Sequence, residues 1–380
     1  MTHSHPQLFQ PINLTDGVQL RNRIVMAPMT TWAGTEDFHI APDEEVYYRR
    51  RVNGVGLVVT GCAQVTANGI GFTDEFSAAD DSFIPSLKRL SDAAKSGGAP
   101  ALLQLFHAGN KALPHLIPGG DVVSASAIPT LATPFVPALT PRALTTDEVQ
   151  QMVMAFGDAT RRAIEAGFDG IELHAAHGFL LQNFLSPATN IRTDEWGGSL
   201  ENRMRFPIAV IEEVTRVITE HGKRPFVLGI RISPEEPGNK GYRIEQTLEF
   251  VNRLLEHHVD YLHVSLSDLL NDRPIDDSDG ATIIGRIVTL VDGRVPVLAA
   301  GGILIPEQAN QALEIGISCV AIGRGLIINP DWVSLAQEGV DVDTFLDPAE
   351  VTSLEIPPKL WTIIQGLKGW FPIKPTHEIV

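Results

Sequence analysis

The amino-acid sequence predicts one α/β barrel of the (β/α)8, or TIM barrel, class, with an N-terminal hairpin lid and a C-terminal tail. The chain has 380 residues, of which 44% are hydrophobic and 20% charged, so it can bury a large core. Short β-branched runs alternate with amphipathic helical patterns, which is the order of elements in a parallel barrel. We find eight such runs, and eight strands close a barrel of this class.

The first predicted element is a hairpin over residues 8–21, which alternate around an Asp-Gly turn and should cover the lower face of the barrel. The strands are expected at 23–27, 56–62, 101–105, 170–174, 226–233, 261–265, 297–300 and 319–322. The helix before the fourth strand should start with a capping box of Thr145 and Glu148 and end at Gly167. Another helix is expected at 201–220.

Two segments lie outside the repeating pattern. The Pro-rich stretch 128–141 predicts a loop insertion over the active face of the barrel. We assign residues 1–345 to the barrel domain and residues 346–380 to the tail. Because Trp361 and Trp370 are too apolar for a free chain end, the tail should pack on the barrel or on a neighbouring subunit of a homo-oligomer.

Charge and cysteine content exclude several classes of protein. The formal net charge is −17 and no basic run occurs, so the chain should not bind nucleic acid. No secretory signal and no apolar run of transmembrane length are present, so we expect a soluble cytoplasmic protein without membrane contact. The two cysteines, Cys62 and Cys319, lie in strand-like runs, which argues against a disulfide framework or an iron–sulfur cluster.

The segment from His174 to Phe206 is the strongest functional signal. His174 and His177 follow the apolar run GIEL, where a strand of the predicted barrel ends. An isolated HxxH pair is compatible with a satisfied core or with two metal ligands. Many hydrogen-bonding residues follow this pair, which favours a functional site over packing, and no HExxH or CxxC pattern completes a metal site.

Other strand ends also carry polar or glycine residues. Gln104 ends the third strand and Arg231 the fifth, where a buried cation needs a partner. A buried structural amide and a structural salt bridge are the alternatives for these two residues. The last two strands lead into Gly301-Gly302 and Gly323-Arg324, the kind of loop that binds phosphate in this barrel class.

Together these segments resemble the old yellow enzyme family, especially its bacterial branch related to NADH:flavin oxidoreductases. The resemblance implies a bound FMN and covers residues from about 8 to 335. It places the flavin-contacting residues in loops after several strands. They are Pro28, Met29, Thr30, Cys62, Gln104 and Arg231 around the flavin ring, and Gly301, Gly302, Gly323 and Arg324 at the phosphate.

The resemblance also implies a mechanism. NAD(P)H reduces FMN, departs, and an activated alkene such as an enone or nitroalkene takes hydride in the same site. His174 and His177 hold the acceptor oxygen as charge develops on it. Trp32, Phe179 and Tyr242 are assigned to the substrate pocket. Phe179 replaces the tyrosine that protonates the substrate in most relatives, so Tyr242 or water is the expected proton donor.

The sequence is also compatible with two other functions. An NAD(P)H oxidase or a quinone or nitro reductase would use the same flavin and would not need the proton donor. A flavin-binding module without turnover is the second alternative, although the two retained histidines speak against it. Small molecules are the expected partners in every case.

Overall fold

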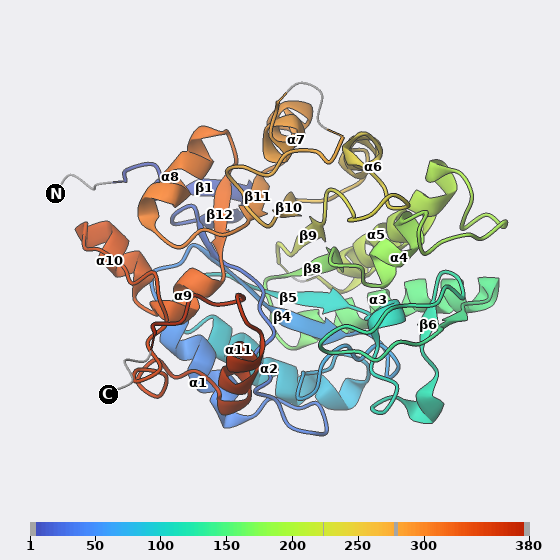
Figure 1. Ribbon diagram of the computed structural model, residues 1–380, viewed down its shortest axis with the longest axis horizontal. Coiled ribbons are helices and arrows are strands. Elements are labelled where there is room, and N and C mark those ends of the chain that lie inside the picture. The colour runs from blue at the N-terminus through green and yellow to red at the C-terminus, as the bar shows by residue number, and fades with distance from the viewer. Residues whose placement is uncertain (1–4, 223, 277–279, 376–380) are drawn as a thin grey trace.

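The computed structural model describes residues 5–222, 224–276 and 280–375. Its centre is a closed barrel of parallel strands in the order β10-β11-β12-β3-β4-β5-β8-β9, so the predicted fold class is confirmed (Figure 1). The barrel strands are β3 (Ile24–Met26), β4 (Leu57–Gln64), β5 (Ala101–Phe106), β8 (Gly170–Ala175), β9 (Val227–Ile232), β10 (Tyr261–Ser265), β11 (Val297–Ala300) and β12 (Cys319–Ile322).

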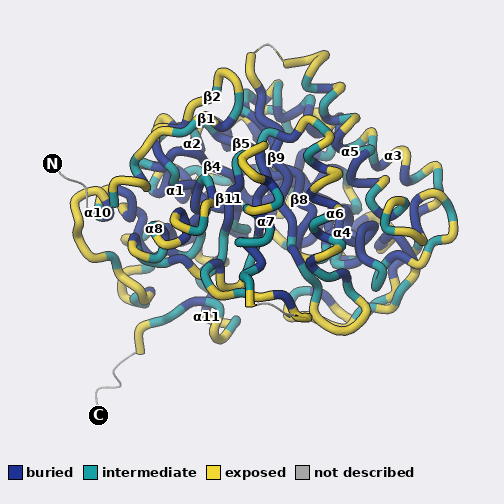
Figure 2. The backbone as a smooth tube through the Cα atoms, turned by 90° about the horizontal axis from the view of Figure 1, so that it is seen from above, coloured by how far each residue is buried: buried dark blue, intermediate teal, exposed yellow. Residues whose placement is uncertain are grey.

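The predicted hairpin consists of β1 (Ile12–Thr15) and β2 (Val18–Leu20), which pair antiparallel. Leu14 and Leu20 belong to one buried cluster with barrel residues such as Val25 and Leu57. The hairpin therefore closes the amino-terminal end of the barrel, as predicted. Figure 2 shows β1 and β2 at one end of the molecule and α11 (Pro358–Gly366) at the other.

Helices surround the barrel. The capping box is confirmed, since Thr145 accepts from the backbone of Glu148 at 3.2 Å and Glu148 accepts from the backbone of Thr145 at 2.7 Å. Gly167, with a φ of 85°, follows the end of this helix. The helices are α1 (Pro42–Arg51), α2 (Ile84–Ala94), α3 (Thr146–Glu165), α4 (Leu180–Leu185), α5 (Leu200–His221), α6 (Ile244–Leu255), α7 (Ile283–Val291), α8 (Pro306–Glu314), α9 (Arg324–Ile328), α10 (Trp332–Glu338) and α11.

Shorter elements lie in the connecting segments. They are the strands β6 (Val123–Ser124) and β7 (Arg142–Ala143) and the 3-10 turns Asp81–Phe83, Gly109–Lys111 and Pro118–Gly120. In the described part of the chain, no helix combines the length and apolar character needed to cross a bilayer.

The C-terminal segment returns to the barrel after α10. Leu346 and Ile373 form a parallel bridge, and Phe371 is buried. The ring of Trp370 lies 6.2 Å from that of Trp32, which follows β3. The division into domains at residue 345 stays a prediction. Residues 1–4, 223 and 277–279 of the predicted domain and residues 376–380 of the predicted tail lie outside the described residues.

Candidate active site

A cavity of about 710 Å³ lies at the carboxyl ends of the barrel strands. The Pro-rich insertion contributes to its lining through Thr133, Pro134, Phe135 and Val136. The cavity brings together most of the residues predicted for the flavin ring and the substrate, although they are far apart in the sequence. They are Pro28, Met29, Thr30, Trp32, Cys62, Gln104, His174, His177, Phe179 and Arg231.

A second cavity of about 410 Å³ adjoins the first, because both are lined by Met29, Arg231 and Trp370. It contains the remaining predicted cofactor residues, Gly301, Gly302, Gly323 and Arg324.

Tyr242 does not join this group. It is 1% exposed, and its hydroxyl donates to the backbone oxygen of Ser233 at 2.7 Å. Neither cavity is lined by Tyr242. The structure therefore does not bring Tyr242 into the predicted substrate pocket, since the chain after β9 turns the side chain toward its own loop.

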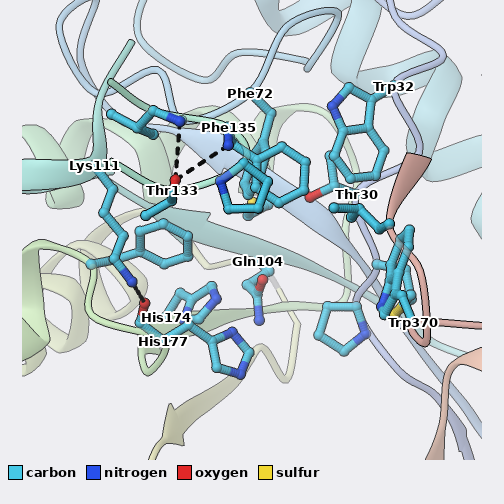
Figure 3. A pocket seen from close by; sticks show the side chains of 18 of the residues that line it. Thr30, Trp32, Phe72, Gln104, Lys111, Thr133, Phe135, His174, His177 and Trp370 are labelled. Atoms are coloured by element: carbon cyan, nitrogen blue, oxygen red, sulfur yellow. Dashed lines mark hydrogen bonds between the residues drawn. The ribbon is translucent and has the colours of Figure 1, made fainter. Parts of the chain in front are cut away.

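His174 and His177 lie side by side where β8 ends, and their ring centres are 5.0 Å apart. His177 has a φ of 59°, in the left-handed region that most side chains avoid. This turn brings the second imidazole next to the first beside Gln104 (Figure 3). Among the residues described, no third potential ligand completes a metal cluster with the pair.

The hydrogen bonds of the pair assign a proton to each ring. The backbone N–H of Ala176 donates to Nδ1 of His174 at 3.2 Å, so the His174 proton lies on Nε2. Arg231 donates to Oγ of Ser265 at 3.1 Å, and this hydroxyl lies 2.8 Å from Nε2 of His177. We assign Ser265 as donor to Nε2, which puts the His177 proton on Nδ1.

Both imidazoles are neutral at physiological pH. Burial is the main cause that lowers the pKa of His174 and of His177 well below the ordinary value of histidine, and the charge of Arg231 lowers both further. Within the described part of the chain, Nε2 of His174 and Nδ1 of His177 form no hydrogen bond. The pair therefore offers two N–H donors to an oxygen in the cavity.

The barrel interior below this pair holds a buried polar network. Nε2 of Gln104 donates to Glu172 at 2.7 Å, and Tyr261 and His263 each contact the other carboxylate oxygen at 2.8 Å. One of the two N–H groups of Gln104 is thus used within the barrel, and the other N–H and the carbonyl oxygen remain for a ligand. Of the four residues in this network only Gln104 was predicted, because the other three appear as ordinary strand residues in the sequence.

The donor groups fit FMN. Nε of Arg231 is buried without a hydrogen-bond partner among the described residues, so this donor is left for an acceptor such as the flavin pyrimidine edge. The second cavity combines glycine backbone with Arg324 and the hydroxyls of Ser265 and Ser267. No carboxylate occurs among the described residues that line it, which suits a phosphate.

Aromatic rings form the wall of the main cavity opposite the histidines (Figure 3). Trp32 packs on Phe72 at 5.5 Å, on Phe135 at 5.9 Å and on Trp370 at 6.2 Å between ring centres. The sequence predicted Trp32 alone of these four, since the others come from loops whose approach depends on closure of the barrel. The site is therefore largely apolar with a few polar groups at one side, as is common for small-molecule sites.

Two strand-end residues have local partners. Sγ of Cys62 lies 3.4 Å from Glu75, a buried carboxyl whose pKa is raised well above its ordinary value mainly by burial. His107 accepts from the backbone of Gly109 at 2.9 Å, and burial lowers its pKa to about 3. His107 is consequently a structural residue, whereas Cys62 lines the cavity.

Comparisons with known proteins agree with this geometry. Residues 7–343 match the NADH:flavin oxidoreductase / NADH oxidase family. The chain is 39% identical over 376 residues to a probable NADH-dependent flavin oxidoreductase, YqiG, of Bacillus subtilis (strain 168), covering 98% of this chain and 100% of that protein. It is 37% identical to an NADH:fumarate oxidoreductase of Klebsiella pneumoniae (strain 342), covering 94% of this chain but only 39% of the relative.

Solved structures of related proteins align with the fold of this chain. An old yellow enzyme homologue from Zymomonas mobilis aligns with a TM-score of 0.79 and 26% identity, covering 94% of this chain and 99% of that one. Morphinone reductase in complex with tetrahydroNAD aligns with a TM-score of 0.77 and 26% identity, covering 99% and 100%.

Proposed function

Because the chain belongs to the NADH:flavin oxidoreductase / NADH oxidase family, we propose that it transfers hydride from NAD(P)H through FMN to activated alkenes such as enones and nitroalkenes. The protein is an NAD(P)H-dependent flavin oxidoreductase of the old yellow enzyme type with FMN as cofactor. It is an enzyme, so the alternative of a flavin-binding module without turnover is set aside.

The observation that carries the proposal is the pair of neutral imidazoles at the end of β8. His174 and His177 each retain an N–H donor, and the opposite wall of the cavity is aromatic. Two such donors stabilise the negative charge that grows on a carbonyl or nitro oxygen as hydride arrives at the alkene. FMN supplies the hydride-carrying group when bound, and Arg231 and Gln104 are the residues that would hold its pyrimidine edge.

A second candidate function is favoured by Phe179. This side chain has no acidic proton to donate, and its ring centre lies 4.9 Å from that of His174. Quinones, nitro compounds and oxygen accept electrons without protonation of a carbon, so they are the competing acceptors. A cytoplasmic location and assembly into a homo-oligomer remain further parts of the proposal.

Separate half-reactions test the function. The protein is reduced anaerobically with NADH or NADPH and then mixed with β-nitrostyrene, 2-cyclohexenone or menadione, while flavin absorbance is followed. We expect the nitroalkene to reoxidise the enzyme, and His174→Ala to slow this step by about 10²–10³ while FMN stays bound. Reoxidation by menadione and oxygen alone would contradict alkene reduction and support the second candidate.

A further inference from the structure

The main cavity is positively charged in a strongly acidic protein. Three cationic residues, Lys111, Arg231 and Lys368, line it, and no Asp or Glu occurs among its described lining residues. The whole chain has 46 acidic and 29 basic residues. A cavity that concentrates cations against this background attracts anions.

The three cations differ in position. Arg231 lines both cavities and belongs to the flavin end of the site, and Lys368 is exposed. Lys111 is half-buried, and its ammonium donates to the backbone oxygen of His177 (Figure 3). Its Nζ lies 5.8 Å from the ring centre of Phe179. Lys111 is therefore the cation next to the pair that holds the acceptor oxygen.

Lys111 has no carboxylate partner in the described part of the chain. Glu236 is the acidic residue that affects it most, but this carboxylate accepts from Gln182 at 3.0 Å and from Ser186. Burial lowers the pKa of Lys111, and the charge of Glu236 offsets this effect only in part. Only one of its three N–H groups is used by His177, so two remain for an anion.

We propose that Lys111 is an anion-binding residue of the substrate site and selects acceptors that carry a carboxylate in addition to the oxygen held by His174 and His177. The inference rests on the proposed function and names its substrate class. A 4-oxo-2-enoate has the required groups, with the ketone oxygen on the imidazoles and the carboxylate on Lys111. One hydride from NAD(P)H adds to the carbon β to the ketone, one proton from water adds to the α carbon, and the C=C bond becomes C–C.

Binding of two matched phenols to the oxidised holoenzyme tests the charge preference without turnover. The probes are 4-hydroxybenzoate and 4-hydroxybenzamide, which differ in charge at one end of the same ring. The dissociation constants are measured from the long-wavelength absorbance change of the flavin. We expect wild type to favour the carboxylate by about 10- to 100-fold, because a charge-assisted hydrogen bond is gained.

Variants of the two lysines test which of them causes the preference for the carboxylate probe. Lys111→Gln should lower the affinity for 4-hydroxybenzoate much more than that for 4-hydroxybenzamide and so remove the preference, and Lys111→Arg should keep most of it. Lys368→Gln makes the same charge change at the exposed lysine and should leave the preference intact. Equal affinities in wild type, equal loss of both phenols in Lys111→Gln, or loss of the preference in Lys368→Gln would each overturn the inference.

Turnover separates this inference from the proposed function. Lys111→Gln should lower kcat/KM for 4-oxo-2-pentenoate by about tenfold or more relative to that for its primary amide. Reduction of both compounds with no difference between wild type and variant would refute the anion site and leave alkene reduction standing. A charge-dependent phenol affinity in a protein that reduces no alkene would refute the function and support the anion site.

Discussion

At the scale of one residue, Phe179 determines which group can protonate the α carbon of the substrate. Its ring is 6% exposed and packs edge-on against His174 and, at 5.1 Å, against Phe106. Tyr242 is no substitute, because its hydroxyl is committed to the backbone of Ser233. Water is therefore the remaining donor of the two that the sequence suggested.

The first prediction concerns Phe179→Tyr. The variant should accelerate reduction of 2-cyclohexenone, because a positioned general acid typically contributes about 10²–10⁴-fold. Reduction of the flavin by nicotinamide should not change, since that step needs no proton at carbon. Stopped-flow measurement of the two half-reactions checks this. If wild type already reduces enones rapidly and the tyrosine adds nothing, the deficit assigned to Phe179 is refuted.

Individual residues also show which parts of the candidate site could be predicted from the sequence. His174, His177, Gln104 and Arg231 were predicted because each is a polar group where an apolar strand ends. Tyr242 was misplaced, because a loop after a strand can turn its side chains toward the cavity or back on itself. Lys111 follows Gln104 by seven residues but was not predicted as a site residue, since nothing local in the sequence shows that it lies beside Phe179.

At the scale of elements, a buried hydrogen bond ties α1 to the loop after β3, which lines the main cavity. Glu44 in its first turn is fully buried, and Oγ1 of Thr31 lies 2.8 and 2.7 Å from its two carboxylate oxygens. Burial raises the pKa of Glu44 to about 8. The folded protein thus holds a proton that the unfolded chain releases near pH 4.5, the ordinary value for this group.

The second prediction follows from this linkage. Because the folded-state pKa is raised, the contribution of Glu44 to stability is complete below pH 4.5 and is lost as the pH rises toward 8. Glu44→Gln keeps the shape without the charge, so its stability relative to wild type should increase between pH 5 and about 8.5. Urea unfolding at several pH values measures the difference. A difference that is independent of pH would show that Glu44 does not titrate in this range.

Sequence patterns predicted strands better than short helices. Each barrel strand is buried along most of its length, so it appears as an apolar run whatever the loops do. By contrast, α4, α9 and α10 have 6, 5 and 7 residues, too few for a helical period to stand out. They form because the barrel provides a surface for them, which is information outside the local sequence.

At the scale of the whole molecule, closure of the barrel creates the site, and the C-terminal segment completes it. Gly366, Leu367, Lys368 and Trp370 line the main cavity, and Trp370 also lines the second. Nη1 of Arg324 donates to the backbone oxygen of Trp370 at 2.6 Å. The segment predicted as a tail therefore forms part of the lining in addition to its contacts with the barrel.

The last prediction is that removal of residues from Trp361 onward destabilises the protein and weakens FMN retention. The deletion removes Ile364 and Phe371, which are 1% and 4% exposed, and each buried side chain of this size contributes roughly 2–5 kcal/mol. It also removes residues that line both cavities, together with the carbonyl partner of Arg324. We expect the melting temperature to fall by at least about 5 °C and the flavin to be lost on gel filtration.

Trp370→Ala is the matched control, because it retains the rest of the segment and the backbone bond to Arg324. It should open the aromatic wall beside Trp32 and weaken FMN retention less than the deletion does. Light scattering at several protein concentrations tests the other part of the tail prediction. A deletion that lowers the oligomer size would place the segment on a neighbouring subunit. A deletion that changes neither stability, flavin content nor oligomer size would refute its packing role, because removal of buried aromatic surface lowers the free energy of unfolding measurably.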